Sequence, residues 1–209
     1  AAESFISEQR QMQRGDWQAA MDQAPQHAEG VCESGGQDHF YLEGQVSLAL
    51  PMEDDGVHIY CSTQHPSEVQ HATAAVLGLA DHSITVEVRR MGGGFGGKTH
   101  VWIEPVALAL SRKANRPVKM AMSREEVFKA SGPTCSSSMD VRIGARKDGT
   151  ITSARIECRY NDGAFPGIWG MLGCMTAWAC YDVQNFKAIG IDVLTNRPKV
   201  AAYRAPSAP

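Results

Sequence analysis

The sequence lacks the features that mark several common functional classes. Its 20 basic and 23 acidic side chains give a formal net charge of −3, without the positive excess that nucleic-acid and anionic-membrane binders carry. No apolar run approaches the roughly 18 residues of a membrane span. The first residues also lack a basic start followed by an apolar stretch, so no secretion signal is expected there. We therefore expect a cytoplasmic protein with no nucleic acid among its partners and no membrane span.

The cysteines lack the spacing of a metal or disulfide site. The six are Cys32, Cys61, Cys135, Cys158, Cys174 and Cys180. No two are separated as in CxxC, and a chain of 209 residues is not a short one. A zinc ribbon, a ferredoxin-type iron–sulfur cluster and a disulfide scaffold are therefore not expected. Reduced and mostly buried thiols fit these cysteines better.

Strand and helix patterns alternate along the chain. Period-two alternation and turn signals predict strands over 45–50, 57–62, 84–88, 117–122, 138–146, 151–160 and 185–194. Helical spacing and capping residues predict helices over 16–23, 66–79, 103–114 and 123–130, and one within 168–180. These patterns, with hairpins among them, predict an α+β fold with mixed sheets and flanking helices. Residues 1–34 are predicted to be an N-terminal connecting segment, and 35–209 the folded domain.

A run of glycines is the most informative local feature. Five glycines fall within the six positions 92–97, interrupted only by Phe95. Each glycine costs conformational entropy, so such a run indicates a backbone that adopts positive φ or approaches another group closely. Its successive amide N–H groups can hold an anion or a metal-bound oxygen. A tight connection that binds no ligand is the alternative.

Residues 92–99 also satisfy the nucleotide-binding expression GxxxxGK[ST], with Lys98 and Thr99 at its end. A P-loop protein needs a second strand that ends in an acidic metal ligand, and residues 189–192 match this only weakly. The dinucleotide fingerprint GxGxxG fits the same glycines, but no acidic residue follows at the required place. A P-loop-like nucleotide binder is therefore a remote alternative.

Four segments together resemble one family. The stretch RMGGGFGGK at 90–98 closely resembles the glycine motif of the molybdenum hydroxylases, the superfamily of xanthine dehydrogenase, aldehyde oxidase and carbon monoxide dehydrogenase. GGQDHFYLE at 35–43, STQ at 62–64, and the stretch from NRP to AAYRAP at 196–206 resemble further motifs of that family, in its order and approximate spacing. The resemblance runs from about residue 27 to the end.

The resemblance implies an oxidoreductase. Residues 35–209 would be the first molybdopterin-binding domain of a xanthine dehydrogenase-like large subunit, with the second molybdopterin domain missing. The chain would be a portion of the molybdenum–pterin subunit of a hydroxylase, which oxidises an aldehyde or N-heterocycle with water-derived oxygen. None of its acidic residues matches the family's glutamate general base, so the chain alone is expected to be inactive. The alternative is a non-catalytic folded fragment, or a split-subunit piece that needs a partner chain for cofactor binding.

The site that the resemblance implies contains outer-sphere contacts and no direct metal ligand. Gln64 would be the catalytic residue, as an amide donor to the apical ligand of the metal. The cofactor-binding residues would be Gly93, Gly94, Phe95, Gly96, Tyr203, Arg204 and Ala205. Gln64, Phe95 and Gly96 would be the outer-sphere contacts of the metal. Other roles stay open: Gln64 as a cap of the helix near Pro66, Arg204 as a surface arginine, and His39 as a hydrogen-bonded structural histidine.

Cofactors and partners also follow from the resemblance. The cofactor would be molybdenum–molybdopterin, as such or in its cytosine dinucleotide form. Iron–sulfur and FAD centres would lie on partner subunits, because no motif for them occurs here; a homo-oligomer stays open. Thr99 stands where xanthine dehydrogenases carry the glutamate that contacts the purine, and residues 170–173 contain no substrate arginine. Purine oxidation is therefore not expected.

Overall fold

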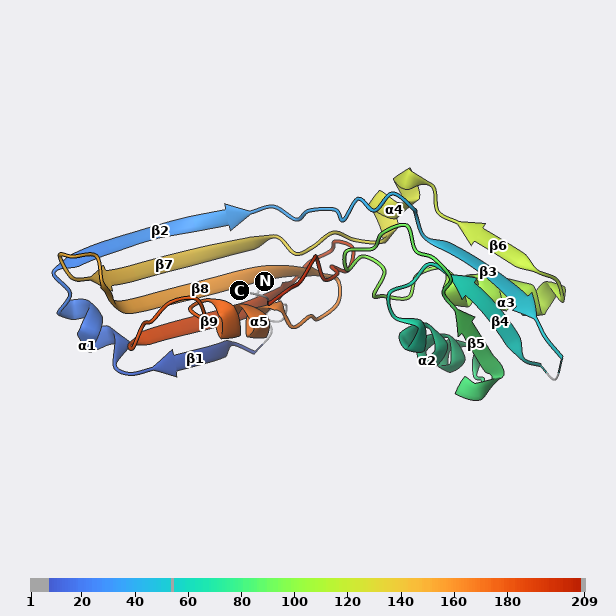
Figure 1. The fold of residues 1–209 in the computed structure, drawn as a ribbon, viewed down its shortest axis with the longest axis horizontal. Coiled ribbons are helices and arrows are strands. Elements are labelled where there is room, and N and C mark those ends of the chain that lie inside the picture. Colours follow the sequence, from blue (N-terminus) through green and yellow to red (C-terminus); the bar gives the residue numbers. More distant parts are fainter. Residues whose placement is uncertain (1–7, 54, 208–209) are drawn as a thin grey trace. The chain divides into compact units, whose positions relative to one another are not determined.

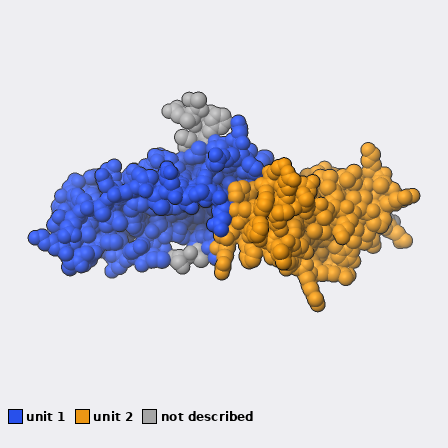
Figure 2. All heavy atoms as spheres, turned by 90° about the horizontal axis from the view of Figure 1, so that it is seen from above, with its two compact units in different colours: residues 1–37, 134–200, 205–209 blue, residues 38–133, 201–204 orange. Residues whose placement is uncertain are grey.

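The computed structural model describes residues 8–53 and 55–207 of the chain. These residues form two compact units, which Figure 2 shows in different colours. Unit 1 contains the described residues of 1–37, 134–200 and 205–209, and unit 2 contains those of 38–133 together with 201–204. Unit 2 is thus the middle of the chain with one short return segment.

Unit 1 is built on a five-stranded sheet (Figure 1). Its strand order is β1 (Arg10–Arg14), β9 (Phe186–Leu194), β8 (Ile151–Gly163), β7 (Ser137–Ala145) and β2 (Gln26–Ser34). Strands β8 and β9 pair in parallel, and the other pairs are antiparallel. The apolar core lies between this sheet and helix α5 (Trp169–Thr176). Helix α1 (Trp17–Asp22) packs on β7 and β8, and the side chain of Asp16 caps it.

Unit 2 is built on a four-stranded sheet. Its strand order is β5 (Ile84–Glu87), β4 (Val57–Cys61), β3 (Val46–Pro51) and β6 (Val118–Ala121). Its helices are α2 (Pro66–Leu77), α3 (Glu104–Ala114) and α4 (Arg124–Ala130), with a 3₁₀ turn at Asp81–Ser83. Helices α2 and α3 pack against one another and against the sheet, and residues such as Ile59 and Leu108 are fully buried between them.

The helices and the inner strands lie where the sequence predicts them, but strands β1 and β2 were not predicted. Every residue of these two strands is exposed, and they are the two edges of their sheet. A strand without a buried face has no alternation of polar and apolar residues, so its sequence carries no strand pattern. Much of the predicted connecting segment 1–34 is thus part of a sheet, while residues 1–7 lie outside the described part.

Two expectations from composition can be compared with the fold. Among the described residues, no helix has the length and apolar character needed to span a bilayer. All six cysteines are free. Cys61, Cys158 and Cys174 are buried as expected, whereas Cys32 and Cys180 are exposed.

We predict that Leu108→Ala lowers the free energy of unfolding of unit 2 by about 2–5 kcal/mol, because Leu108 is 0% exposed and its removal leaves a cavity. Leu110→Ala in the same helix is the control, since Leu110 is 45% exposed. Urea unfolding followed by the fluorescence of Trp102, the tryptophan of unit 2, measures both. Equal losses in the two variants would contradict the packing described for α3.

Candidate functional site

The glycine loop, defined here as residues 92–98, packs tightly against other parts of unit 2. A Cβ atom on Gly94 would lie 2.5 Å from Oε1 of Gln64, and one on Gly97 would lie 2.6 Å from the Tyr41 ring. Gly96 has a φ of 101°, and a Cβ there would overlap the carbonyl oxygen of Ala202. At Gly96 and Gly97 only glycine allows the approach, because the neighbours are main chain and buried rings, whereas at Gly94 the neighbour is the end of the Gln64 side chain. The run of glycines therefore meets a packing requirement, whether or not the loop also binds a ligand.

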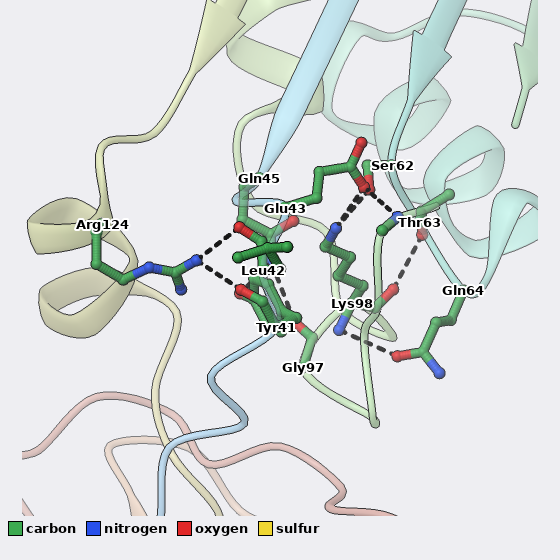
Figure 3. Close-up of polar contacts among 11 residues, drawn as sticks. Tyr41, Leu42, Glu43, Gln45, Ser62, Thr63, Gln64, Gly97, Lys98 and Arg124 are labelled. Atoms are coloured by element: carbon green, nitrogen blue, oxygen red, sulfur yellow. Dashed lines mark hydrogen bonds and ion pairs between the residues drawn. The ribbon is translucent and has the colours of Figure 1, made fainter. Parts of the chain in front are cut away.

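Gln64 holds the glycine loop through its side-chain oxygen (Figure 3). Oε1 accepts hydrogen bonds from the amides of Gly96 at 2.8 Å and Lys98 at 3.3 Å, while the amide of Gln64 donates to the Lys98 carbonyl at 2.8 Å. The alternative role of Gln64 as a helix cap is wrong. The N-cap of α2 is His65, and that helix start has no side-chain capping bond.

Lys98 is fully buried and paired. Its Nζ donates to Oε2 of Glu43 at 2.9 Å and to Oγ of Ser62 at 2.5 Å, and lies 4.9 Å from the centre of the Tyr41 ring. Burial lowers the pKa of the Lys98 ammonium, and the hydrogen bond and charge of Glu43 oppose that shift. The lysine of a P-loop must reach the phosphates of its nucleotide. This geometry disfavours the nucleotide-binding alternative, because Nζ is already enclosed and α3 begins only at Glu104.

Glu43 is the acceptor at the centre of this arrangement. Its Oε2 receives three donors: the Ser62 hydroxyl at 2.5 Å, the Gly92 amide at 2.8 Å and Nζ of Lys98. Burial raises the pKa of the Glu43 carboxyl, but these hydrogen bonds and the charge of Lys98 outweigh it, so the pKa lies below its ordinary value of 4.5. Glu43 is therefore ionised at neutral pH.

Polar side chains brace the segment that carries Glu43. Nε2 of Gln45 donates to the Tyr41 hydroxyl at 2.8 Å and to the Gly97 carbonyl at 3.1 Å. From helix α4, Nη2 of Arg124 donates to the carbonyls of Tyr41 at 2.5 Å and Leu42 at 3.0 Å, as Figure 3 shows. The segment before β3 is thus tied both to the glycine loop and to α4.

The return segment 201–204 lies against the glycine loop. The amide of Arg204 donates to the Phe95 carbonyl at 2.9 Å, and Nε2 of His39 lies 2.6 Å from the Ala202 carbonyl. His39 is 5% exposed and hydrogen-bonded, as expected of a structural histidine, and its ring lies 5.3 Å from the ring of Tyr203.

The structure thus brings most of the expected site residues together in unit 2. Gln64, the glycines from Gly93 to Gly96, Phe95, Tyr203 and Arg204 are joined by the contacts given above. Phe95 is 49% exposed with a φ of 52°, and the side chain of Arg204 is exposed. Ala205, which the sequence analysis included in the site, belongs to unit 1.

The arrangement offers hydrogen-bond donors and not metal ligands. Within the described part of the chain, the amides of Gly93, Gly94 and Phe95 and the Nε2 of Gln64 make no hydrogen bond. The amide of Gly96 is already engaged by Gln64. The same described residues contain no cluster of three His, Cys, Asp or Glu side chains that could hold a metal ion. Such a donor set fits an oxygen-rich anionic group and fits outer-sphere contact with a metal centre.

Sequence reasoning missed Glu43, Ser62 and Gln45 as parts of the site. Glu43 ends the stretch 35–43 and Ser62 begins the stretch 62–64, both of which resemble motifs of the family named from the sequence. A buried lysine needs an anionic partner, but only if its burial is known. The sequence places Lys98 in a glycine-rich segment, which is more typical of an exposed loop, and so gave no sign of that burial.

Comparison with known proteins adds to this geometry. A family model described as "Molybdopterin cofactor-binding domain" matches residues 2–209. The xanthine dehydrogenase of Calliphora vicina is 37% identical over 201 residues, which is 91% of this chain and 14% of that protein. Aldehyde oxidase 3 of Rattus norvegicus is 32% identical over 208 residues, 97% of this chain and 16% of that protein. The chain therefore spans about one seventh of the length of these relatives.

Solved structures share the fold. Quinoline 2-oxidoreductase from Pseudomonas putida 86 superposes with a TM-score of 0.90 at 22% identity, over 95% of this chain and 26% of that one. Aldehyde oxidoreductase from Desulfovibrio gigas gives a TM-score of 0.89 at 22% identity, over 97% of this chain and 23% of that one. At such identities the likeness concerns the fold alone.

We predict that Gly96→Ala lowers the free energy of unfolding of unit 2 by about 1–3 kcal/mol more than Gly78→Ala does, because a backbone overlap adds to the strain of positive φ. Gly78 is the matched control: its φ is 63°, but a Cβ there would meet nothing within 4 Å. Urea unfolding measures both variants. A difference near zero would mean that segment 201–204 does not press on the loop.

We also predict that Glu43→Gln removes a contribution to the free energy of unfolding that is present at neutral pH and lost in acid. The pKa of Glu43 is lower in the folded state, so its contribution is complete above pH 4.5 and is lost as the pH falls through the folded pKa. Wild type should therefore exceed Glu43→Gln in stability at pH 6, and the gap should narrow toward pH 3. Urea titrations across this range measure it, and a gap that stays constant down to pH 3 contradicts the assignment.

Proposed function

Because this chain belongs to the molybdopterin cofactor-binding domain family, we propose that its glycine loop forms part of the cofactor site of a larger molybdenum hydroxylase. The observation that carries the proposal is the donor set of the loop. The amides of Gly93, Gly94 and Phe95 and the Nε2 of Gln64 have no partner among the described residues. The three amides belong to a loop whose position is fixed by hydrogen bonds to Glu43 and Gln64, and the Nε2 belongs to the Gln64 side chain that makes part of those bonds.

The residues fit the cofactor in chemical type. When bound, the molybdenum cofactor supplies the redox centre that takes two electrons from the substrate. Nε2 of Gln64 would donate to an oxygen ligand of the metal, because the Oε1 of the same side chain is tied to the loop. The free loop amides would donate to the same anionic group. Phe95, half exposed beside them, would exclude water, and Tyr203 and Arg204 would contact the cofactor from the return segment.

The proposed reaction is the oxidation of an aldehyde or N-heterocycle with oxygen from water. Of the relatives named above, aldehyde oxidase 3 of Rattus norvegicus supports an aldehyde among these substrates. Thr99 argues against a purine. Its hydroxyl donates to the Gly96 carbonyl at 2.8 Å, so this position holds the loop and offers no carboxylate to a substrate.

The activity is proposed for the larger protein and not for these 209 residues alone. The chain spans 14% to 16% of the relatives named above. We propose that a second molybdopterin domain completes the site and that iron–sulfur and FAD centres lie on other domains or subunits. We also propose that the cofactor is bound as such or in its cytosine dinucleotide form, and that this chain needs those partners in order to bind it.

The test compares Gln64→Glu with Gln64→Leu in the larger enzyme. Glutamate keeps an acceptor for the amides of Gly96 and Lys98 but lacks the NH₂ donor, whereas leucine lacks both. We expect Gln64→Glu to lower turnover by roughly a hundredfold or more, as the loss of a donor to developing negative charge does, with near-normal stability. Gln64→Leu should in addition lose about 1–3 kcal/mol of stability, because two amides lose their acceptor.

Steady-state kinetics, molybdenum content and thermal unfolding of both variants provide the measurements. Unchanged turnover together with unchanged molybdenum content in Gln64→Glu would contradict the proposed role of this site.

A further inference from the structure

We propose that Glu43 is the positioning residue of the glycine loop: one oxygen of its carboxylate holds both ends of the loop, and through them the partners of Gln64. The part of this inference that concerns the cofactor rests on the proposed function. The part that concerns the loop rests on geometry alone.

The two ends of the loop meet at a single atom. Oε2 of Glu43 accepts from the amide of Gly92, the first residue of the loop, and from Nζ of Lys98, its last residue, at 2.8 and 2.9 Å. The main chain of Glu43 adds a bond, since its amide donates to the Gly92 carbonyl at 3.2 Å. Between these two anchored ends lie the glycines and Phe95.

The anchored end at Lys98 sets the environment of Gln64. The Lys98 amide donates to Oε1 of Gln64, and the Lys98 carbonyl accepts from both the Gln64 amide and the Thr63 hydroxyl. Because the Lys98 side chain is fully buried along its length, the bond from its Nζ to Glu43 also restricts its main chain. Glu43 therefore acts on the orientation of the Gln64 side chain through Lys98, without touching Gln64.

The hydrogen bonds of Glu43 are those of a residue that holds a position. All three of its side-chain hydrogen bonds go to Oε2, and Oε1 has no hydrogen-bond partner among the described residues. Glu43 also lines a cavity of about 170 Å³ in unit 2, together with Ser62, Tyr60 and Arg89. The segment before it is held by Arg124, so the carboxylate is presented from a fixed main chain.

The experiment compares Glu43→Gln and Glu43→Asp in the larger enzyme that contains this chain. Glutamine keeps the length of the side chain but loses the charge that Lys98 needs. Aspartate keeps the charge but is one methylene shorter, so it cannot reach both loop ends from the same main chain. Ser62→Ala is the matched control: it removes one hydrogen bond to the same oxygen and one from Nζ of Lys98, but it leaves both bonds from Glu43 to the loop ends in place. If Glu43→Gln does not fold, Glu43→Asp alone still provides the measurement.

Hydrogen–deuterium exchange read by mass spectrometry distinguishes positioning from a merely structural role. We expect exchange in peptides that cover residues 92–98 to rise about tenfold to a hundredfold in both Glu43 variants, because local opening sets the exchange rate. Peptides from β3 and β4 should change little, and Ser62→Ala should have a smaller effect on the loop. No rise in the loop overturns the proposal. An equal rise in exchange throughout unit 2 also overturns it, and so does a rise in loop exchange in Ser62→Ala that equals the rise in the Glu43 variants.

Molybdenum content and turnover of the same preparations separate this inference from the proposed function. Loss of cofactor or of turnover in parallel with loop exchange supports both. Loop exchange that rises while both quantities stay at the wild-type level upholds the role of Glu43 and contradicts the cofactor role of the loop.

Discussion

A buried ammonium group constrains the candidate site. Lys98 is 0% exposed, and an unpaired charge at such a position would be strongly destabilising. Glu43 and Ser62 compensate for it, and both must therefore lie beside the glycine loop. The amide and the carbonyl of the same lysine make hydrogen bonds with Gln64. This ion pair and the hydrogen bonds of Ser62 and Gln64 thus join three segments that are distant in the sequence.

The glycine loop combines close packing against unit 2 with unpaired amides that a ligand could contact. Gly96 and Gly97 are needed because the main chain of Ala202 and the ring of Tyr41 come too close for any side chain, and Gly94 leaves room for the end of the Gln64 side chain. This is the tight connection that the sequence left as an alternative to ligand binding. The two interpretations do not compete, however. A backbone packed this closely on one side can present its unpaired amides, those of residues 93–95, to a ligand on the other.

In unit 2 the packed core and the candidate functional residues lie on different elements. Sheet and helices supply a packed core, while the functional candidates lie on the loop and on segments that contact it. The Oε1 of Gln64 accepts hydrogen bonds from the loop, while its Nε2 stays available to a ligand. The hydroxyl of Thr99 also bonds to the loop, at the Gly96 carbonyl. A loop held by so many internal contacts is preorganised, which is what electrostatic catalysis requires of its donors.

The sequence by itself determined the inner strands, the helices with their capping residues such as Asp16 and Ser123, and the importance of the glycine run. These features depend on local periodicity and on local hydrogen bonds, which the sequence expresses directly. Resemblance to a family added Gln64 and Arg204, which periodicity does not single out. Only the tertiary structure decided that strands β1 and β2 exist, because strands exposed on both faces carry no pattern. It also decided that Glu43 and Lys98 form a pair, since burial arises when distant segments fold against one another and no local pattern encodes it.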